Sequence, residues 1–250
     1  MLRSIKNLQR FSVSATDGPI GHVDALYFDD ERWTVRYLVV DTASWRLGRL
    51  VLVSPRAIRH IDWSARTVAL SITRDQVRNS PDIDTRRPVS RQHEAEFLRY
   101  YHYPHYWGTP GWTIGGLEEL RAEEKANAAE DSHLRSTREV LGSHVHALDG
   151  ELGHVDDFLV DDESWAIRDV VVDTNNWWFG RKVLVAPESI HEVKWPDRKV
   201  FVALPRRSVK HGPPYEADAS IEQQWEADHD AHHRRADTEF PAQKDRHSSA

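Results

Sequence analysis

The sequence has no cysteine among its 250 residues. Disulfide bonds, zinc–thiolate sites and thiol catalysis are therefore excluded for this chain, which suits a reducing compartment. No run of about 18 apolar residues occurs that could span a membrane. The basic start, "MLRSIKNLQRF", lacks the apolar stretch of a signal peptide. We therefore expect a soluble, cytoplasmic protein without a membrane span.

Positive charge is also in short supply. Lys and Arg total 33 against 40 Asp and Glu, which gives a formal net charge of -7. Proteins that bind phosphate backbones or anionic lipid usually carry a cationic excess, so nucleic acid is a minor hypothesis for this chain. What the sequence does have is tryptophan. Ten tryptophans are unusual for this length and require an explanation.

The chain repeats itself. The segment from Asp17, "DGPIGHVDALYFDDERWTVRYLVVDTASWRLGRLVLVSPRAIRHIDW", aligns without a gap on the segment from Asp149, "DGELGHVDDFLVDDESWAIRDVVVDTNNWWFGRKVLVAPESIHEVKW". The offset, 149 − 17, is 132 residues, and about half of the roughly 47 positions are identical. Agreement of this extent indicates a duplicated domain.

Each copy contains the pattern of short strands. Runs such as "GHVDALYFDD", "TVRYLVVDT" and "RLVLVSP" are rich in β-branched residues and end at acidic turns or at proline. Turn signals about every ten residues predict a small closed or nearly closed antiparallel barrel in each copy. The predicted fold class is mainly β, with two tandem barrels, a helical and aromatic linker and a short C-terminal helix. The predicted domains are a first barrel at 1–81, a linker at 82–135, a second barrel at 136–213, and a helical extension with a disordered tail at 214–250. Within the linker we expect a helix at about 90–102.

Candidate catalytic and metal-binding residues are few. His22 and Asp24 recur as His154 and Asp156, but no nucleophile or third ligand recurs beside them, so we favour a structural pair on a strand. The turns "DDER" and "DDES" lack the glycine and glutamate of a calcium loop and are typical of hairpins. In "HDAHHRR" the spacing of two histidines suits a metal, but the segment is polar and unmatched in the first copy. We therefore expect neither an enzyme nor a resident metal or cofactor.

The stretch "LRYYHYPHYWGTPGW" is the better candidate for a function beyond folding. Its aromatic side chains can pack on a barrel, contact a partner protein or stack nucleic acid bases, and a single arginine does not make the cationic track that the last role needs. A second candidate is Trp178, which stands where the first copy has Arg46 in an otherwise shared hairpin. The candidate partner-contact residues are Tyr103, Tyr106, Trp107, Trp112 and Trp178.

The repeated segment resembles a PRC-barrel domain. Both copies carry the pattern D-G-x-x-G-x-V, a hydrophobic strand, a polar turn, a V-V-D-T strand, a hairpin with glycine, and a strand that ends in proline. The phrase "PVSRQHEAEFLRYY" followed by "YW" also resembles bacterial tandem PRC-barrel proteins. The family includes the cytoplasmic domain of the photosynthetic reaction centre H subunit and the C-terminal domain of a ribosome-maturation factor.

The resemblance implies a fold, without catalytic residues to transfer. We predict a non-enzymatic protein-binding or assembly module with a protein partner or self-association. One alternative is an RNA- or ribosome-associated factor. A further alternative is a reaction-centre-like accessory in light-driven electron transfer.

Overall fold

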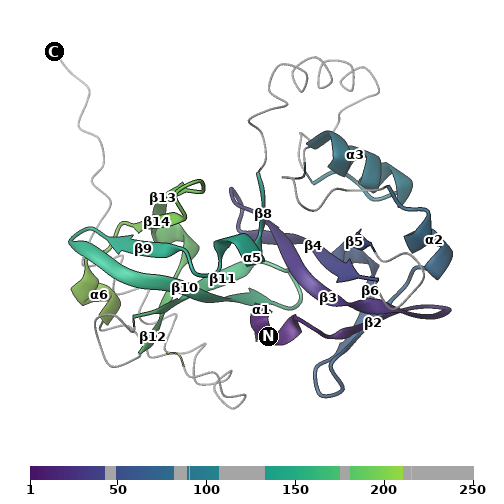
Figure 1. Ribbon diagram of the computed structural model, residues 1–250, viewed down its shortest axis with the longest axis horizontal. Coiled ribbons are helices and arrows are strands. Elements are labelled where there is room, and N and C mark those ends of the chain that lie inside the picture. The colour runs from purple at the N-terminus through teal and green to yellow at the C-terminus, as the bar shows by residue number, and fades with distance from the viewer. Residues whose placement is uncertain are drawn as a thin grey trace. The chain divides into compact units, whose positions relative to one another are not determined.

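The computed structural model describes residues 1–42, 49–81, 89, 91–106, 133–174, 181–210 and 215. This part of the chain is mainly β, as the sequence predicts (Figure 1). The elements up to the linker are β1 Leu2–Ser4, α1 Ile5–Leu8, β2 Ser12–Ala15, β3 Gly18–Asp29, β4 Thr34–Asp41, β5 Leu50–Val53, the 3-10 helix η1 Pro55–Ala57, β6 Ile58–Asp62, β7 Thr67–Leu70, α2 Arg74–Arg78 and α3 Arg91–Tyr100. The elements after it are β8 Leu134–Ser136, α5 Thr137–Val140, β9 His144–Ala147, β10 Gly150–Asp161, β11 Ile167–Asp173, β12 Lys182–Val185, η2 Pro187–Ser189, β13 Ile190–Lys194, β14 Lys199–Val202 and α6 Arg206–Lys210.

The two halves of the chain have the same elements in the same order. Each element from β1 to α2 has a counterpart 132 residues later, with ends that agree to within one residue. The strand orders also agree, because β5-β4-β3-β2-β7-β6 in one sheet corresponds to β12-β11-β10-β9-β14-β13 in the other. The predicted duplication is therefore confirmed.

Each sheet has seven strands and follows an open path in the described residues, so the predicted closed barrel is not confirmed. The prediction of purely antiparallel pairing is wrong at one place in each copy, since β2 pairs with β7, and β9 with β14, in parallel. The physical reason lies in the 3-10 turn η1, which begins at Pro55 and connects β5 at one edge of the sheet to β6 at the other edge. The chain runs in the same direction in β5 and β6, so β7, which forms a hairpin with β6, lies parallel to β2.

The seventh strand of each sheet comes from the other copy. Strand β8 pairs antiparallel with β3, with Tyr27 opposite Ser136 and Asp29 opposite Leu134. Its counterpart at the N-terminus, β1, pairs with β10. Each copy thus contributes its first strand to the long hairpin strand of the other.

Contacts group the chain into two units. The first-copy unit contains Arg3–Leu141 together with Asp157–Arg168, which form the tip of the β10–β11 hairpin. The second-copy unit contains Met1–Leu2, Gly142–Asp156 and Asp169–Ala250. The domain boundaries given above stay a prediction.

One hydrophobic cluster of the first-copy unit lies between its sheet and helix α3, which covers β4 and β5 (Figure 1). Phe97 on α3 is fully buried and packs edge-on against Tyr37 of β4, with ring centroids 5.1 Å apart. Burial of one such side chain contributes about 1.5–3 kcal/mol. The cluster contains Ala25, Tyr27, Tyr37, Val39, Leu52, Val89, Phe97, Leu98 and Leu134.

The repeated glycine of the G-H-V-D segment is required by a close backbone contact. A Cβ atom on Gly21 would lie 1.9 Å from the carbonyl oxygen of Asp41, and one on Gly153 would lie 2.1 Å from that of Asp173. No side chain fits at such distances, so strand β3 can approach the end of β4 only with glycine here. Both copies meet the same requirement.

Among the described residues, no helix is long and apolar enough to cross a membrane.

Candidate functional site

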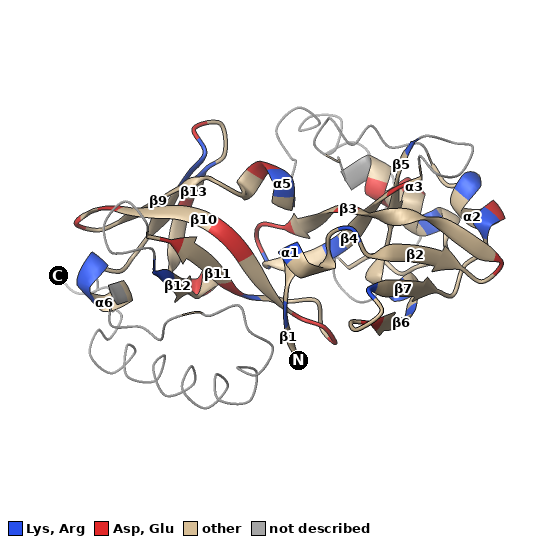
Figure 2. Ribbon diagram, turned by 60° about the horizontal axis from the view of Figure 1, so that its bottom comes forward, with Lys and Arg blue, Asp and Glu red and all other residues tan. Residues whose placement is uncertain are grey.

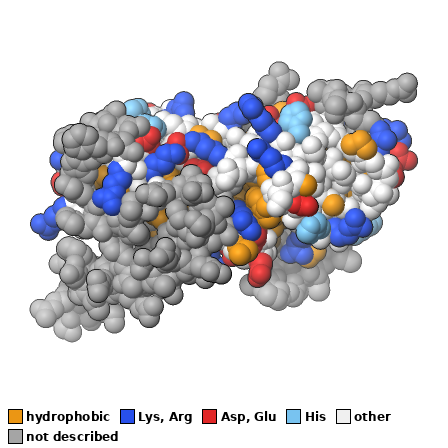
Figure 3. All heavy atoms as spheres, turned by 90° about the horizontal axis from the view of Figure 1, so that it is seen from below, with side chains coloured by type: hydrophobic (Ala, Val, Ile, Leu, Met, Phe, Trp, Pro, Cys, Tyr) orange, Lys and Arg blue, Asp and Glu red, His pale blue; other side chains and the backbone are white. Residues whose placement is uncertain are grey.

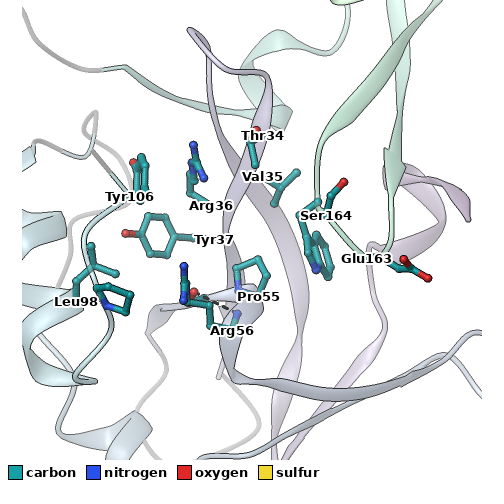
Figure 4. Close-up of a pocket in the computed structure, with 13 residues that line it drawn as sticks. Thr34, Val35, Arg36, Tyr37, Pro55, Arg56, Leu98, Tyr106, Glu163 and Ser164 are labelled. Atoms are coloured by element: carbon teal, nitrogen blue, oxygen red, sulfur yellow. Dashed lines mark hydrogen bonds between the residues drawn. The ribbon is translucent and has the colours of Figure 1, made fainter. Parts of the chain in front are cut away.

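A pocket of about 310 Å³ opens in the first-copy unit. Its walls come from the start of β4, from η1, from the segment around the end of α3 and from the turn between β10 and β11 (Figure 4). The lining residues are Thr34, Val35, Arg36, Tyr37, Ser54, Pro55, Arg56, Leu98, Pro104, Tyr106, Glu163, Ser164 and Trp165.

Reciprocal backbone hydrogen bonds hold the rim of this pocket. The amide of Val35 donates to the carbonyl of Trp165 at 2.8 Å, and the amide of Ile167 donates to the carbonyl of Trp33 at 2.7 Å. Both tryptophans have a left-handed backbone, with φ of 48° at Trp33 and 61° at Trp165. This conformation costs about 1–2 kcal/mol for a residue with a side chain. The reciprocal bonds offset that cost and fix Trp165 at the pocket.

The acidic residues of the two turns have a structural role. The Oδ1 atom of Asp29 accepts hydrogen bonds from the amides of Glu31 and Arg32, both at 3.1 Å. The Oδ1 atom of Asp161 accepts from the amide and the hydroxyl of Ser164, at 2.7 and 2.6 Å. These are hairpin turns closed by an aspartate side chain, as the sequence indicates. The described residues contain no group of three potential metal ligands.

Two arginines give the pocket its cationic character. Arg36 pairs with Asp29 at 3.0 Å, and its guanidinium lies 3.8 Å from the ring centroid of Tyr106. Arg56 is exposed on η1 and has no ion pair within the described part of the chain. In Figure 4 the ring of Tyr37 lies between these two side chains. The charged side chains of the pocket are thus Arg36, which is held by Asp29, the exposed Arg56, and the exposed Glu163.

A buried polar cluster forms the floor behind the pocket. Glu94 of α3 is completely buried, and its Oε1 accepts hydrogen bonds from the hydroxyls of Tyr37 at 2.9 Å and Tyr106 at 2.6 Å. Its Oε2 lies 2.8 Å from Nε2 of His133, an ion-pair distance, although no hydrogen bond of normal geometry reaches that oxygen. A buried carboxylate is costly unless such donors surround it.

The Tyr37 hydroxyl of this cluster is a donor over the whole physiological pH range. Burial, and then the charge of Glu94, raise the pKa of the Tyr37 hydroxyl far above its usual range. The hydroxyl therefore keeps its proton and its hydrogen bond to Glu94. The cluster ties together α3, the segment that follows it at Tyr106 and the entry to β8 at His133, and so fixes the position of the Tyr106 ring.

Two of the five predicted contact residues lie in the described part of the chain, and both pack against the core of the first-copy unit. Tyr106 also lines the pocket. Tyr103 is half-buried and stacks on Tyr101, with ring centroids 5.7 Å apart and an interplanar angle of 13°. Burial raises the pKa of the Tyr103 hydroxyl, and the positive charge of Arg56 opposes that shift. The described part of this segment thus packs on the hydrophobic cluster and contributes one wall of the pocket.

The other three predicted contact residues lie outside the described residues, as do the histidines of "HDAHHRR". They are Trp107, Trp112 and Trp178. Their roles stay predictions.

The recurring His–Asp pairs do not form a catalytic arrangement. Asp24 pairs with Arg138 at 2.6 Å, and Asp156 pairs with Lys182 at 2.8 Å. His22 lies 3.8 Å from Asp41, which is on the neighbouring strand. Asp24 and Asp156 are therefore each engaged in an ion pair with a basic residue of another element.

Sequence reasoning missed Arg36, Arg56, Trp165 and the pair of Glu94 and His133. Glu94 carried a signal, because it precedes Phe97 and Leu98 by three and four residues and therefore lies on the apolar face of the helix. A lone carboxylate on such a face requires buried partners. No comparable signal exists for Arg56, which occupies an ordinary surface position.

Comparison with known proteins adds no assignment to this geometry. No family model matches the chain, and no curated protein sequence matches it either.

Proposed function

We propose that the chain is a non-enzymatic protein-binding module, made of two PRC-barrel-like copies, that receives an acidic side chain of its partner in the Arg36–Arg56 pocket. The observation that carries this proposal is the exposed guanidinium of Arg56, beside a cavity with aromatic walls and without an ion pair in the described residues. Arginine, tyrosine and tryptophan are the residue types that dominate the energetics of protein interfaces.

The composition of the walls suggests what would bind. The two arginines favour a carboxylate, which can accept two hydrogen bonds from one guanidinium. Pro55, Leu98 and Trp165 supply apolar contact for the rest of the ligand. A segment with an acidic residue next to an apolar one matches this arrangement.

The two copies differ at the positions that matter for this chemistry. The counterpart of Arg56 is the exposed Glu188, and the counterpart of Tyr37 is Asp169. The positive charge of Arg56 is therefore absent from the second copy, whereas Arg36 has a counterpart in Arg168. The barrel likeness of both copies rests on the shared D-G-x-x-G pattern and on the buried V-V-D-T strands, and the closure of either barrel remains part of the proposal.

A photo-cross-linking experiment tests this function. A photoreactive amino acid replaces the exposed rim residue Glu163 in one protein and Arg59, which lies outside the pocket, in another. Irradiation in native cells, followed by mass spectrometry, should give a protein adduct from position 163 that position 59 does not give. Ribonuclease treatment before purification should leave the adduct unchanged, and an RNA adduct instead would favour the ribosome-associated alternative.

Charge reversal provides the control for specificity. Arg56→Glu introduces the residue of the second copy and should weaken capture of the same partner roughly tenfold or more, because interface arginines are frequent hot spots. Arg59→Glu makes the same change in charge outside the pocket and should have little effect. Equal capture by both variants would rule out the pocket as the binding site.

A further inference from the structure

A second candidate surface of the first-copy unit lies where the chain leaves α1 and where β6 turns into β7. Phe11, directly before β2, packs edge-on against Trp63 of this turn, with ring centroids 5.4 Å apart. The guanidinium of Arg66 lies 5.4 Å from the centroid of the Phe11 ring, and that of Arg3 lies 4.7 Å from the centroid of the Trp63 ring. Arg10, the residue before Phe11, is exposed. We call Arg10, Phe11, Trp63 and Arg66 the basic patch.

Arg10 occupies a position that favours glycine. Helix α1 ends at Leu8, and Arg10, two residues later, has a left-handed backbone with φ of 68°. Glycine is the usual residue at this place after a helix, because a side chain makes the left-handed conformation costly. The second copy follows this rule, since its counterpart is Gly142 with φ of 79°. The first copy thus keeps a strained arginine where the same fold is built with glycine.

The two arginines of the basic patch are neighbours. The carbonyl of Arg66 accepts a hydrogen bond from the amide of Ser12 at 3.0 Å, which brings the β6–β7 turn beside the connection from α1 to β2. In the second copy, a Cβ atom on Gly142 would lie 3.4 Å from a guanidinium nitrogen of Arg198. Arg10 fills the equivalent place in the first copy and therefore puts a second cation beside Arg66.

The fixed charges of the basic patch do not balance. Arg10 and Arg66 are both exposed, and neither forms an ion pair within the described part of the chain. The acidic residue of the turn is Asp62, whose Oδ1 accepts a hydrogen bond from the amide of Ala65 at 2.8 Å. Two arginines thus stand against one aspartate. Because arginine keeps its charge at every physiological pH, this excess does not depend on the titration of any group.

The cations beside the basic patch have partners of their own. Arg3 pairs with Asp162 at 3.4 Å, and the amide of the exposed Lys6 donates to the carboxylate of Asp157 at 3.1 Å. These groups therefore do not cancel the excess. Figure 2 shows basic positions around α1 and at β7. Figure 3 views the side on which α1 lies in Figure 1, and Lys and Arg side chains gather near the middle of that view, beside hydrophobic ones.

We propose that the basic patch binds an acidic segment of a partner protein. The site is separate from the Arg36–Arg56 pocket, and the proposal does not rest on the function proposed for that pocket. Two neighbouring guanidiniums provide donors for carboxylates, and the half-buried indole of Trp63 provides apolar contact beside them. Nucleic acid fits less well, because two arginines do not form a track along a phosphate backbone and the chain carries a net charge of -7.

The test uses the full chain and fluorescein-labelled decaglutamate, with fluorescence anisotropy at pH 7.5 and low ionic strength. Arg10→Gly introduces the residue of the second copy and should weaken binding about threefold, because exposed charge pairs are individually weak. The same variant should leave the thermal unfolding temperature unchanged or raise it, because glycine removes the strain at this position. This combination of results separates a role in binding from a role in folding.

Arg66→Asn and Arg198→Asn are matched variants at equivalent turn positions, which have φ of 56° and 52°. Asparagine tolerates this conformation, so both proteins should fold. Arg66→Asn should weaken binding about threefold and its combination with Arg10→Gly about tenfold, whereas Arg198→Asn should have little effect. Because decaglutamate also suits the Arg36–Arg56 pocket, the series is repeated in Arg56→Glu. The same losses there would show that the basic patch binds independently of the pocket.

Four outcomes would overturn the proposal. The first is a double variant, Arg10→Gly with Arg66→Asn, that binds decaglutamate as tightly as the unmodified chain. The second is an equal loss in Arg66→Asn and Arg198→Asn, which would assign binding to charge spread over both copies. The third is a lower unfolding temperature for Arg10→Gly, which would give Arg10 a structural role. The fourth is tighter binding of a ten-nucleotide single-stranded DNA than of decaglutamate, which would identify a nucleic acid surface.

Discussion

The two copies keep the same residues where the chain turns and approaches itself, and differ both at exposed positions and at a few buried ones. Asp29 and Asp161 close equivalent turns, and Gly21 and Gly153 permit equivalent backbone contacts. By contrast, Arg56 becomes Glu188 at an exposed position of the same 3-10 helix. The residues that the copies share identify what the turns and close backbone contacts require, and Ala25 and Asp157 show that a buried position can also differ.

The largest loss of stability that tests this comparison is expected at the two equivalent glycines, Gly21 and Gly153. Gly21→Ala and Gly153→Ala would each place a Cβ atom against a carbonyl oxygen of the neighbouring strand. We expect each to lower the free energy of unfolding by about 3 kcal/mol or more, at the upper end of what single substitutions cause. Urea unfolding provides the measurement. Gly18→Ala, whose Cβ would lie 3.4 Å from the flexible side chain of Arg74, should cost less.

A smaller loss is expected at the buried carboxylate of the first copy. Glu94→Ala would leave the hydroxyls of Tyr37 and Tyr106 buried without their acceptor. The expected loss of stability is about 2–3 kcal/mol, because each unsatisfied buried group costs about 1–3 kcal/mol and some repacking occurs. Glu96→Ala, at an exposed position of the same helix, serves as the control in thermal unfolding. Similar melting temperatures for the two variants would contradict a structural role for the cluster.

The smallest expected effect is a pH dependence of the free energy of unfolding. It arises from Asp157, whose counterpart in the first copy is Ala25. Burial raises the pKa of the Asp157 carboxyl, and hydrogen bonds from Ser4, Phe158 and Lys6 only partly oppose this shift. The folded state therefore holds this proton more tightly than the unfolded state. Its contribution to stability is present at acid pH and is lost as the pH rises from about 4 through the raised pKa.

The measurement for Asp157 is urea unfolding at a series of pH values. Asp157→Asn should remove this component and leave a flatter stability curve above pH 4. A curve that falls as steeply as that of the unmodified chain would assign the pH dependence to other groups.

Much of the fold follows from the sequence because it depends on local patterns. The repeat at an offset of 132 residues identifies the duplication, the runs of β-branched residues predict the strands, and the aspartates predict the turns. The helix expected at about 90–102 is found as α3, Arg91–Tyr100. The strand, turn and helix signals are each contained within a few neighbouring residues, and the repeat is found by comparing the sequence with itself.

The rest depends on contacts between distant segments. Both copies contain "LRS" at the first strand, so the sequence does not reveal that β8 pairs with β3 and β1 with β10. Glu94 and His133 meet across the linker, and the pocket is assembled from four separate segments. A pattern read along the chain identifies the elements but not which of them meet.

The exchange of first strands carries an evolutionary consequence. A single copy would leave the edge of its long hairpin strand open, and in a symmetric homodimer the first strand of a second molecule could fill it. In a homodimer every substitution appears twice, at both equivalent surfaces. Covalent fusion removes that restriction. It has allowed one half to carry Arg56 at a pocket rim where the other carries Glu188, while each still supplies the strand that the other lacks.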